Sequence, residues 1–182
     1  MASIYVASLS DYNAGVMFGD WFDLTQYVDA QELTDAVEDM LLLSPTAIKE
    51  GNPAEEWAIH DYEGFGGVRI SEWEAFDLCY ALSEALVEHG DGLAAYLESE
   101  SSDLLGSPED LDDLISRFEE AFVGETTLED YAYEYVNDCV FDPSTPETIR
   151  SYFDYQSFAR DMGYEGYSEV YYNYSTFVFR PI

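Results

Sequence analysis

Basic residues are nearly absent from this chain. Its 182 residues contain six Lys and Arg against 39 Asp and Glu, which gives a formal net charge of −33. A field of that sign repels nucleic acid and anionic lipid surfaces, so neither is expected as a direct partner. The same field attracts basic proteins, cations and basic grooves, and we expect the partner to belong to that class.

Cysteine and long apolar runs are also scarce. Cys79 and Cys139 are the two cysteines, and each lies in a helical-looking stretch with apolar neighbours, so both are expected to be buried, reduced thiols. The N-terminus has no basic stretch followed by a long apolar run, which argues against a signal peptide. No segment approaches the length of a membrane span, so we expect a cytoplasmic protein with no membrane contact.

The motifs of common catalytic and metal sites are missing as well. The sequence contains no G-x-S-x-G, P-loop, H-E-x-x-H or EF-hand pattern. His60 lies beside Asp61 and Glu63, but one His with two acids is a poor metal set, so a structural role is expected. We therefore expect no catalytic residue, no metal and no cofactor, and an enzyme is the least expected class.

Apolar and aromatic residues, in contrast, are plentiful. Hydrophobic residues make up 47% of the chain and aromatic residues 16%, including 16 Tyr. A disordered acidic tail would lack this material, so the chain is expected to fold. Its length suits one large domain or two to three small ones.

The first 69 residues mix strand and helix patterns. Extended segments are predicted over residues 4–8, 16–24 and 56–62, with Gly19-Asp20 breaking the second and a turn at 11–15. A helix capped by Asp29 is predicted from Ala30 to about Leu43, ended by Ser44-Pro45 and followed by a loop at 49–53. Its buried face is predicted to hold Leu33, Val37, Met40 and Leu41.

The middle of the chain reads as helical. Ser71 and Glu74 form a capping-box pattern before an apolar stripe that runs to about His89 and includes Trp73. The segment 90–92 breaks this helix, and a short helix follows to about Glu98. Ser107-Pro108 predicts the start of another, closed by Gly124, with an apolar face of Leu111, Leu114, Ile115, Phe118 and Phe122.

The C-terminal part adds helices and a hairpin. Thr127 begins a helix whose predicted apolar face holds Leu128, Tyr131, Tyr135 and Cys139. A short helix is predicted from Thr145, and a last one over residues 154–162, stopped by Gly163. Residues 168–180 alternate as a strand hairpin that turns at 173–175.

These elements predict an α+β fold. We expect an N-terminal α/β domain at 1–69, a helical middle domain at 70–123, and a C-terminal α+β domain at 124–182. Small sheets with helices lie at both ends of the chain in this prediction.

The negative charge is unevenly spread. Residues 1–69 carry −11, residues 70–149 carry −21, and residues 150–182 carry −1. The nearly neutral, Tyr-rich end has two interpretations, a self-association surface or the closing strands of a small domain.

The predicted helices hold their acids away from their apolar faces, and cations are too few to pair with them. Duplex DNA carries one negative charge per about 1.7 Å of axis, so 33 charges match roughly 55 Å, or about 16 base pairs. Carboxylates on short side chains can occupy roughly the positions of phosphates, so a basic DNA-binding groove would accept them. The candidate partner-binding acids are Asp103, Glu109, Asp110, Asp112, Asp113, Glu119, Glu120, Glu125, Glu129, Asp130, Glu134 and Asp138.

Four segments resemble the ArdA antirestriction proteins of mobile genetic elements. They are IYVASLSDYNAG (4–15), GDWFDL (19–24), EEWAIHDYEGFGG (55–67) and YFDYQSFARDMGYEGY (152–167). The third is the most specific, and its core is Glu56, Trp57, Ala58, Ile59, His60, Asp61, Tyr62, Glu63, Gly64 and Phe65. The resemblance runs from end to end and is loosest in the helical middle.

This resemblance implies a DNA mimic that inhibits type I restriction–modification enzymes. Such proteins occupy the DNA groove of the specificity and methyltransferase core, and they form elongated, curved dimers of three small domains per chain. The C-terminal region contributes to the dimer contact, so a homodimer through that region is expected here. The family has no catalytic residues or cofactor to transfer to this chain.

Two other classes fit parts of the sequence. An acidic adaptor or regulator of another basic DNA-binding protein would carry the same charge. A halophilic protein would also be acidic, although halophilic acidity usually accompanies small apolar residues rather than many Tyr and Phe.

Overall fold

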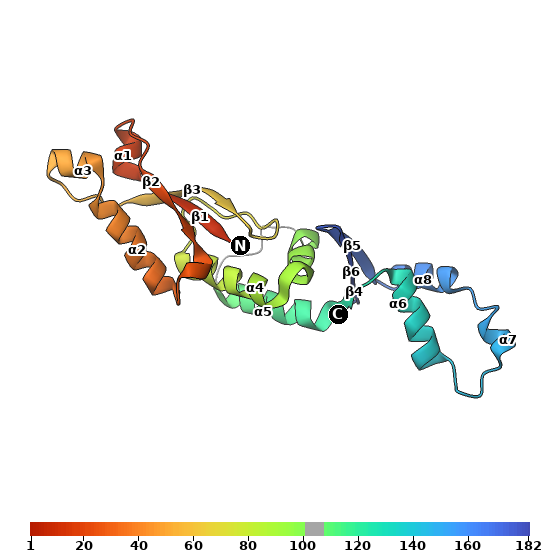
Figure 1. The fold of residues 1–182 in the computed structure, drawn as a ribbon. Coiled ribbons are helices and arrows are strands. Elements are labelled where there is room, and N and C mark those ends of the chain that lie inside the picture. Colours follow the sequence, from red (N-terminus) through yellow and green to blue (C-terminus); the bar gives the residue numbers. More distant parts are fainter. Residues whose placement is uncertain (101–107) are drawn as a thin grey trace. The chain divides into compact units, whose positions relative to one another are not determined.

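The structure is a computed structural model that describes residues 1–100 and 108–182 (Figure 1). The chain divides into two compact units, unit 1 (residues 1–114) and unit 2 (residues 115–182). Each unit contains a three-stranded antiparallel sheet together with helices. This arrangement confirms the predicted α+β class, whereas the division into three domains stays a prediction.

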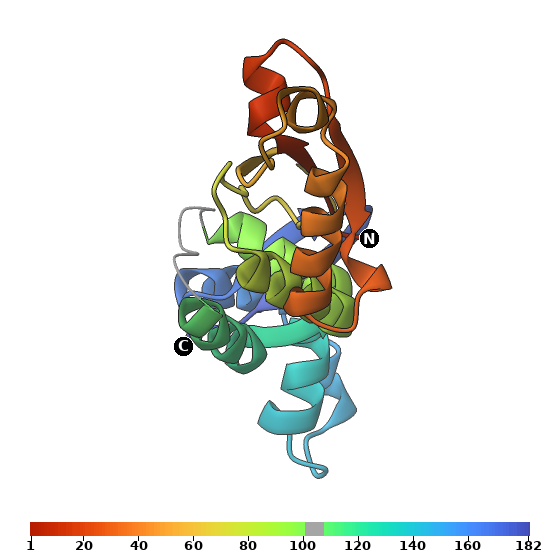
Figure 2. The same cartoon turned by 90° about the vertical axis from the view of Figure 1, so that its left-hand side faces the viewer.

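Unit 1 is built on a sheet with the strand order β2-β1-β3. Helix α2 lies beside these strands (orange in Figures 1 and 2) and contacts β2 and α4. The strands are β1 (Ser3–Ser8), β2 (Gly19–Asp23) and β3 (Trp57–Glu63). The helices are α1 (Leu9–Asn13), the 3₁₀ helix η1 (Leu24–Gln26), α2 (Ala30–Leu42), α3 (Pro45–Glu50) and α4 (Phe76–Ser99).

Helix α2 forms as its sequence predicts. The carboxylate of Asp29 accepts a hydrogen bond from the backbone N–H of Glu32 at 2.8 Å, which satisfies one of the free donors of the first turn. The four predicted core residues of this helix, Leu33, Val37, Met40 and Leu41, are all buried. The cap and the apolar spacing are both local, which explains why the sequence predicts this helix so closely.

Two short helices replace predicted irregular segments. The turn expected at 11–15 is mostly helix α1, which Ser8 caps, and the loop expected to begin at Lys49 starts inside α3. Ser44 ends α2 as predicted, but its hydroxyl also accepts a hydrogen bond from the N–H of Ala47 and so begins α3. Pro45 suits the first turn of a helix, where its missing N–H is not needed.

Buried Asp11 holds α1 and α3 together. Its carboxylate accepts hydrogen bonds from the Ser44 hydroxyl and, at 2.9 Å, from the Thr46 N–H. Burial by itself would raise the pKa of Asp11, but the hydrogen bonds from Ser44, Ser8 and Thr46 outweigh it and lower the pKa to about 2. This acid is therefore part of the fold rather than of a binding surface.

Asp11→Asn is expected to lower the free energy of unfolding by about 2 kcal/mol at neutral pH, because an amide cannot accept from both donors as a carboxylate does. A folded pKa below the unfolded one means that the stabilisation is complete above about pH 4 and is lost as the pH falls toward about 2. Urea unfolding of both proteins across this range measures the difference. A difference that stays constant with pH would contradict the assigned role of the ionised carboxylate.

Three further expectations for unit 1 are wrong in detail. Gly19 and Asp20 do not break an extended segment, because β2 begins at Gly19, where a side chain would strike the backbone of Val6 and Ala7. Ser71 and Glu74 form an isolated turn instead of capping a helix, and α4 begins at Phe76. Trp73 consequently stays exposed instead of joining the apolar stripe.

Helix α4 is two helices separated at Gly90, as predicted. Gly90 has φ 61° and ψ −148°, a conformation that other residues adopt at a cost. Cys79, on the first half, is buried as predicted, and burial, with Glu74 and Asp77 nearby, raises the pKa of its thiol to about 12.

Unit 2 is built on a second sheet, with the strand order β4-β6-β5. Helix α5 (Pro108–Ala121) crosses the division between the units. The strands are β4 (Phe122–Glu125), β5 (Ser168–Tyr172) and β6 (Ser175–Phe179). The other helices are α6 (Leu128–Tyr135), the π-helix η2 (Val136–Val140), α7 (Glu147–Arg150) and α8 (Tyr155–Tyr164).

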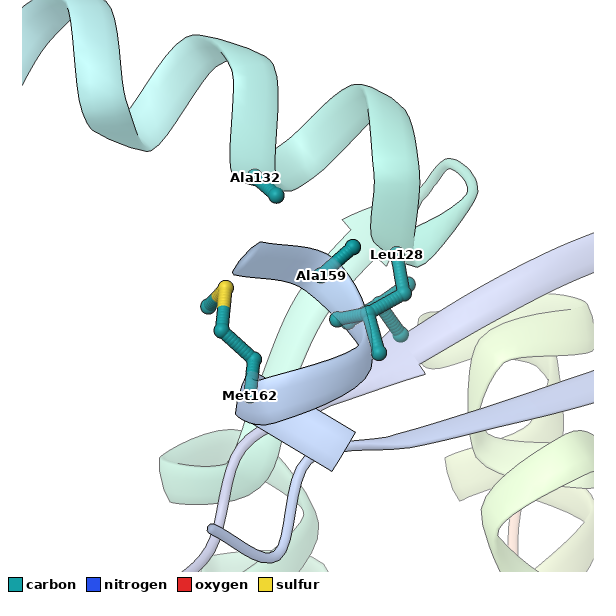
Figure 3. Close-up of a cluster of buried hydrophobic side chains, with 5 residues drawn as sticks. Leu128, Ala132, Ala159 and Met162 are labelled. Carbon is teal, nitrogen blue, oxygen red and sulfur yellow. The ribbon is translucent and has the colours of Figure 1, made fainter. Parts of the chain in front are cut away.

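A small aliphatic core joins α6 and α8 to the sheet of unit 2. In Figure 3 the side chains of Leu128 and Ala132 on α6 face those of Ala159 and Met162 on α8. Val178 of β6 completes the buried cluster. Half-buried aromatic side chains pack around it, which accounts for part of the high Tyr content.

The structure corrects several predictions for unit 2. Phe122 belongs to β4 and not to the preceding helix, and Gly124 lies at an irregularity in the pairing of β4 with β6. Gly163 does not stop α8, which continues to Tyr164. Cys139 is exposed rather than buried, because it lies in the π-helix η2, where the predicted α-helical spacing no longer holds.

The C-terminal hairpin is confirmed. Strands β5 and β6 pair from Ser168 with Phe179 to Tyr172 with Ser175. The two residues between them, Asn173 and Tyr174, have φ angles of 45° and 68°. Positive φ at both positions is typical of the two-residue turns that match the twist of a hairpin.

Candidate functional site

The candidate site is an acidic surface, which we define as the exposed Asp and Glu side chains of the described residues. Four of the described acids are not fully exposed and are therefore not part of this surface. Asp11 is buried, and Asp23, Glu74 and Glu100 are half-buried. The shifted carboxyl pKa values all move downward: hydrogen bonds lower the pKa of Asp23, Asp142 and Asp154, as they do for Asp11. A lowered pKa keeps a carboxyl ionised at neutral pH.

Helix α5 separates its acids from its core as the sequence predicts. Leu111, Leu114 and Phe118 are buried, and Ile115 is half-buried. The described candidate acids of this helix are all exposed: Asp110, Asp112, Asp113, Glu119 and Glu120. Two other candidates fall outside the described residues: Asp103, which precedes α5, and the side chain of Glu109 in the first turn of α5.

Helix α6 also presents its acids to solvent, although its buried face differs from the predicted one. Glu129, Asp130, Glu134 and, in η2, Asp138 are exposed. The buried positions are Leu128, Ala132 and Val136, whereas Tyr131 is half-buried and Tyr135 exposed. The large aromatic side chains suggested the face from sequence, but small Ala132 is what allows α8 to pack closely.

Two candidate acids also make contacts within the chain. Glu125 accepts a hydrogen bond from the hydroxyl of Ser175 at 2.6 Å, which links β4 to β6. Asp130 accepts one from the hydroxyl of Thr127 at 2.7 Å and donates its N–H to the same oxygen at 3.1 Å. These two residues therefore help to hold unit 2 together in addition to adding charge.

Arg150 and Arg180 donate to oxygen atoms other than carboxylates. Arg150 donates to the carbonyl oxygens of Asp142 and Thr145 and to the side-chain oxygen of Asn137, and its guanidinium lies 5.0 Å from the ring centre of Phe141. Arg180 donates from Nε to the carbonyl oxygen of Glu120 at 2.6 Å. The contacts of Arg150 stabilise the loop at residues 141–146, and the contact of Arg180 ties the end of β6 to α5.

An exposed ion pair on α8 contributes little to the stability of the fold. Arg160 and Asp161 are neighbours in sequence, and their closest N–O distance is 2.9 Å. Both side chains are more than half exposed, so the pair adds little to stability.

The residues of the EWAIHDYEGF motif mainly build unit 1. Trp57 stacks on Phe76 with the ring centres 4.1 Å apart, and Ala58, Ile59 and Phe65 are buried. His60 is exposed and meets the ring of Tyr12 edge-on, while Tyr62 meets Phe65 in the same way. The exposed acids Glu56, Asp61 and Glu63 are what the motif adds to the acidic surface.

Gly64, the residue before the last of the motif, lies where any side chain would collide with neighbouring backbone. Its φ angle is 78°, and a side chain would strike the carbonyl of Met1 and the backbone of Ala2. Ala2 is itself buried and accepts a hydrogen bond from the N–H of Leu24. The glycine therefore allows the end of β3 to pass close to the start of β1.

More of the acidic surface lies in unit 1 than the candidate acids predicted from sequence suggest. Residues 1–114 hold 26 acids and 2 bases, and residues 115–182 hold 13 acids and 4 bases, giving formal charges of −24 and −9. Helix α2 alone exposes Glu32, Asp35, Glu38 and Asp39 opposite its buried face. Their spacing between apolar positions was visible in the sequence, so the same reasoning that selected the acids of α5 could have found them.

A surface of exposed carboxylates acts by electrostatic attraction and by accepting hydrogen bonds from bases. Within the part of the chain that the structure describes, no three His, Cys, Asp or Glu side chains are grouped closely enough to hold a metal ion. Among the same residues, no helix is both long and apolar enough to cross a membrane.

The comparison with protein families agrees with the resemblance noted in the sequence. The family model described as "Antirestriction protein (ArdA)" matches residues 4–175. A comparison with curated proteins gave no match. The family match covers all the described helices and strands β2 to β5, together with β1 from Ile4 on, and it ends at Ser175, the first residue of β6.

Proposed function

Since the chain belongs to the ArdA family of antirestriction proteins, we propose that it inhibits type I restriction–modification enzymes by occupying their DNA-binding groove as a mimic of duplex DNA. The observation that carries the proposal is the acidic surface itself. Its carboxylates are exposed on helices and strands of both units, while the opposite faces of the helices are buried. Lysines and arginines that normally contact phosphates would accept carboxylates in the same positions.

The charge balance supports a partner that binds DNA through its backbone. A DNA-binding groove gains affinity by neutralising phosphates and releasing their counterions. A chain with a net charge of −33 offers a comparable number of charges to a groove that spans about 16 base pairs. The proposed partner is the methyltransferase core of the enzyme, and inhibition would then need no catalytic residue or cofactor and would take place in the cytoplasm.

We also propose that the active form is a homodimer through the C-terminal region. Unit 2 carries exposed aromatic side chains on α8 and at the hairpin, with Tyr164 82% and Tyr174 91% exposed. Such side chains are enriched at protein interfaces. A dimer would roughly double the length of duplex that the charges match.

Displacement of DNA tests the proposed function. A fluorescent duplex containing the recognition sequence is bound to a type I methyltransferase core, and the protein is added at moderate salt. We expect the duplex to be released, and the released fraction to rise with the concentration of added protein. If the duplex stays bound while the protein also binds, forming a ternary complex, the protein does not occupy the groove.

The alternative is an acidic adaptor or regulator that binds another basic DNA-binding protein. The acidic surface alone fits that function equally well, whereas the family match favours restriction enzymes. A pull-down from host lysate separates the two by the identity of the captured protein. Capture of a transcription regulator, with no type I enzyme subunit, would favour the alternative.

A further inference from the structure

A groove in unit 1 combines apolar and acidic side chains. It has a volume of about 620 Å³ and lies between α2, the segment 53–57 that leads into β3, and the first residue of α4. The stacked rings of Trp57 and Phe76 line it, together with aliphatic residues of α2 such as Leu41 and Leu42. Leu42 is 69% exposed although it is aliphatic, so this groove offers apolar surface that the fold leaves uncovered.

Four carboxylates stand around this apolar surface. Asp35, Glu38 and Asp39 of α2 and Glu55 before β3 all line the groove and are exposed. Among the lining residues, none is Lys, Arg or His. Asp35 accepts a hydrogen bond from Gln31 at 2.7 Å, a neutral contact that leaves its charge in place.

An arginine side chain has the chemistry that such a groove selects. Its methylene groups and the flat face of its guanidinium suit apolar and aromatic surface, and its N–H groups donate to carboxylates. Lysine shares the charge and the methylene groups but not the planar face. A second copy of this chain is a poor source, because it contains six Lys and Arg in all, and nucleic acid is repelled by the four acids.

We propose that this groove receives an arginine side chain from a basic protein partner, in addition to the electrostatic contacts that the acidic surface makes. For the partner's identity this inference rests on the proposed function, since the DNA groove of a restriction enzyme is a surface rich in such side chains. The groove thus adds a specific, partly apolar contact to a surface that otherwise acts through charge.

Binding of a small probe tests the groove without any restriction enzyme. In a Trp21→Phe/Trp73→Phe background, Trp57 is the one remaining tryptophan of the chain and reports on the groove by its fluorescence. The probe is a short blocked peptide with two arginines, compared with versions that carry lysine or neutral citrulline instead. We expect the arginine peptide to change the Trp57 emission and to bind more tightly than the lysine peptide, with the citrulline peptide weakest.

Two variants of equal charge separate the groove from general attraction. The groove variant carries Asp35→Asn, Glu38→Gln, Asp39→Asn and Glu55→Gln. The control variant carries Glu50→Gln, Asp61→Asn, Glu63→Gln and Glu72→Gln, at exposed acids of unit 1 that do not line the groove. The groove variant should bind the arginine peptide roughly ten-fold more weakly than the parent, and the control less than about three-fold more weakly.

Three results would each overturn the inference. The affinity for the arginine peptide could fall equally in both variants, the Trp57 emission could stay unchanged, or the citrulline peptide could bind as tightly as the arginine peptide. DNA displacement by the parent protein, measured separately, distinguishes this result from the proposed function. If the parent fails to displace DNA while peptide binding behaves as expected, the proposed function fails and the groove remains. If the parent displaces DNA but both variants lose the same affinity for the arginine peptide, the inference about the groove is wrong and the proposal of DNA mimicry remains.

Discussion

Neutralising five acids of α6, η2 and α5 should weaken displacement of DNA from a type I methyltransferase core by roughly 100-fold. The variant carries Asp112→Asn, Asp113→Asn, Glu129→Gln, Glu134→Gln and Asp138→Asn, all at exposed positions. An exposed ion pair contributes about 0.5–0.6 kcal/mol, so five lost pairs amount to about 2.5–3 kcal/mol, or a factor of roughly 100. The competition assay with a fluorescent duplex measures this loss.

A matched control for this variant keeps the charge and changes the side-chain length. It carries Asp112→Glu, Asp113→Glu, Glu129→Asp, Glu134→Asp and Asp138→Glu, and it should displace DNA within about three-fold of the parent, because exposed pairs are worth little individually and tolerate small shifts. The amide variant should remain folded and unfold at a temperature no lower than the parent, since removing like charges relieves repulsion. An amide variant that folds and displaces DNA as well as the parent would show that these acids do not contact the enzyme.

Gly64→Ala should destabilise unit 1 by about 3 kcal/mol. A side chain here combines the strain of a positive φ angle with a collision against the backbone of Met1 and Ala2. Because Ala2 is buried beside the paired strands β1 and β3, the N-terminal segment can move aside only by giving up part of this contact. Chemical unfolding followed by Trp fluorescence reports the change in unit 1, where all three tryptophans lie.

Gly51→Ala is the matched control for the backbone strain alone. Gly51 has a similar φ angle of 75°, but a side chain there would meet no atom within 4 Å. We expect a cost of about 1 kcal/mol at this position. Equal destabilisation by the two substitutions would mean that the close approach of β3 to the N-terminus is unimportant.

The parts of the fold that depend on neighbours in sequence could be predicted. Asp29 and the apolar spacing of α2 are both local signals, and the positive φ angles at Asn173 and Tyr174 belong to a short turn whose position the alternating strands define. The capping pattern of Ser71 and Glu74 was misleading because the same hydrogen bonds also form an isolated turn. Sequence spacing cannot distinguish these two outcomes without knowing what the following residues pack against.

The parts that depend on distant contacts could not be predicted. Phe122 continues the helical spacing of α5, yet it pairs with Phe179 in a strand, 57 positions later in the chain. The core of α6 uses Ala132 in place of Tyr135, because the packing of α8 requires a small residue there. The groove at Trp57 could not be predicted either, because it forms only where α2, the segment before β3 and Phe76 come together in the fold.

The exposure of the acidic residues was easy to predict, but the particular acids that contact the partner were not. Apolar periodicity alone places the acids of α5 outside its core, and the structure confirms the exposure of those whose side chains it describes. The same rule applies to α2, so exposure does not by itself select which acids meet the partner. That selection depends on the shape of the partner's groove, which is not encoded in this chain.

The salt dependence of binding tests the central claim, that exposed carboxylates replace DNA phosphates in the enzyme's groove. The affinity of the protein for the methyltransferase core is measured between about 50 and 200 mM salt, beside the affinity of duplex DNA for the same core. We expect log K to fall steeply and linearly with log salt for both ligands, and less steeply for the five-amide variant. An affinity for the parent protein that stays constant over this range would contradict this claim.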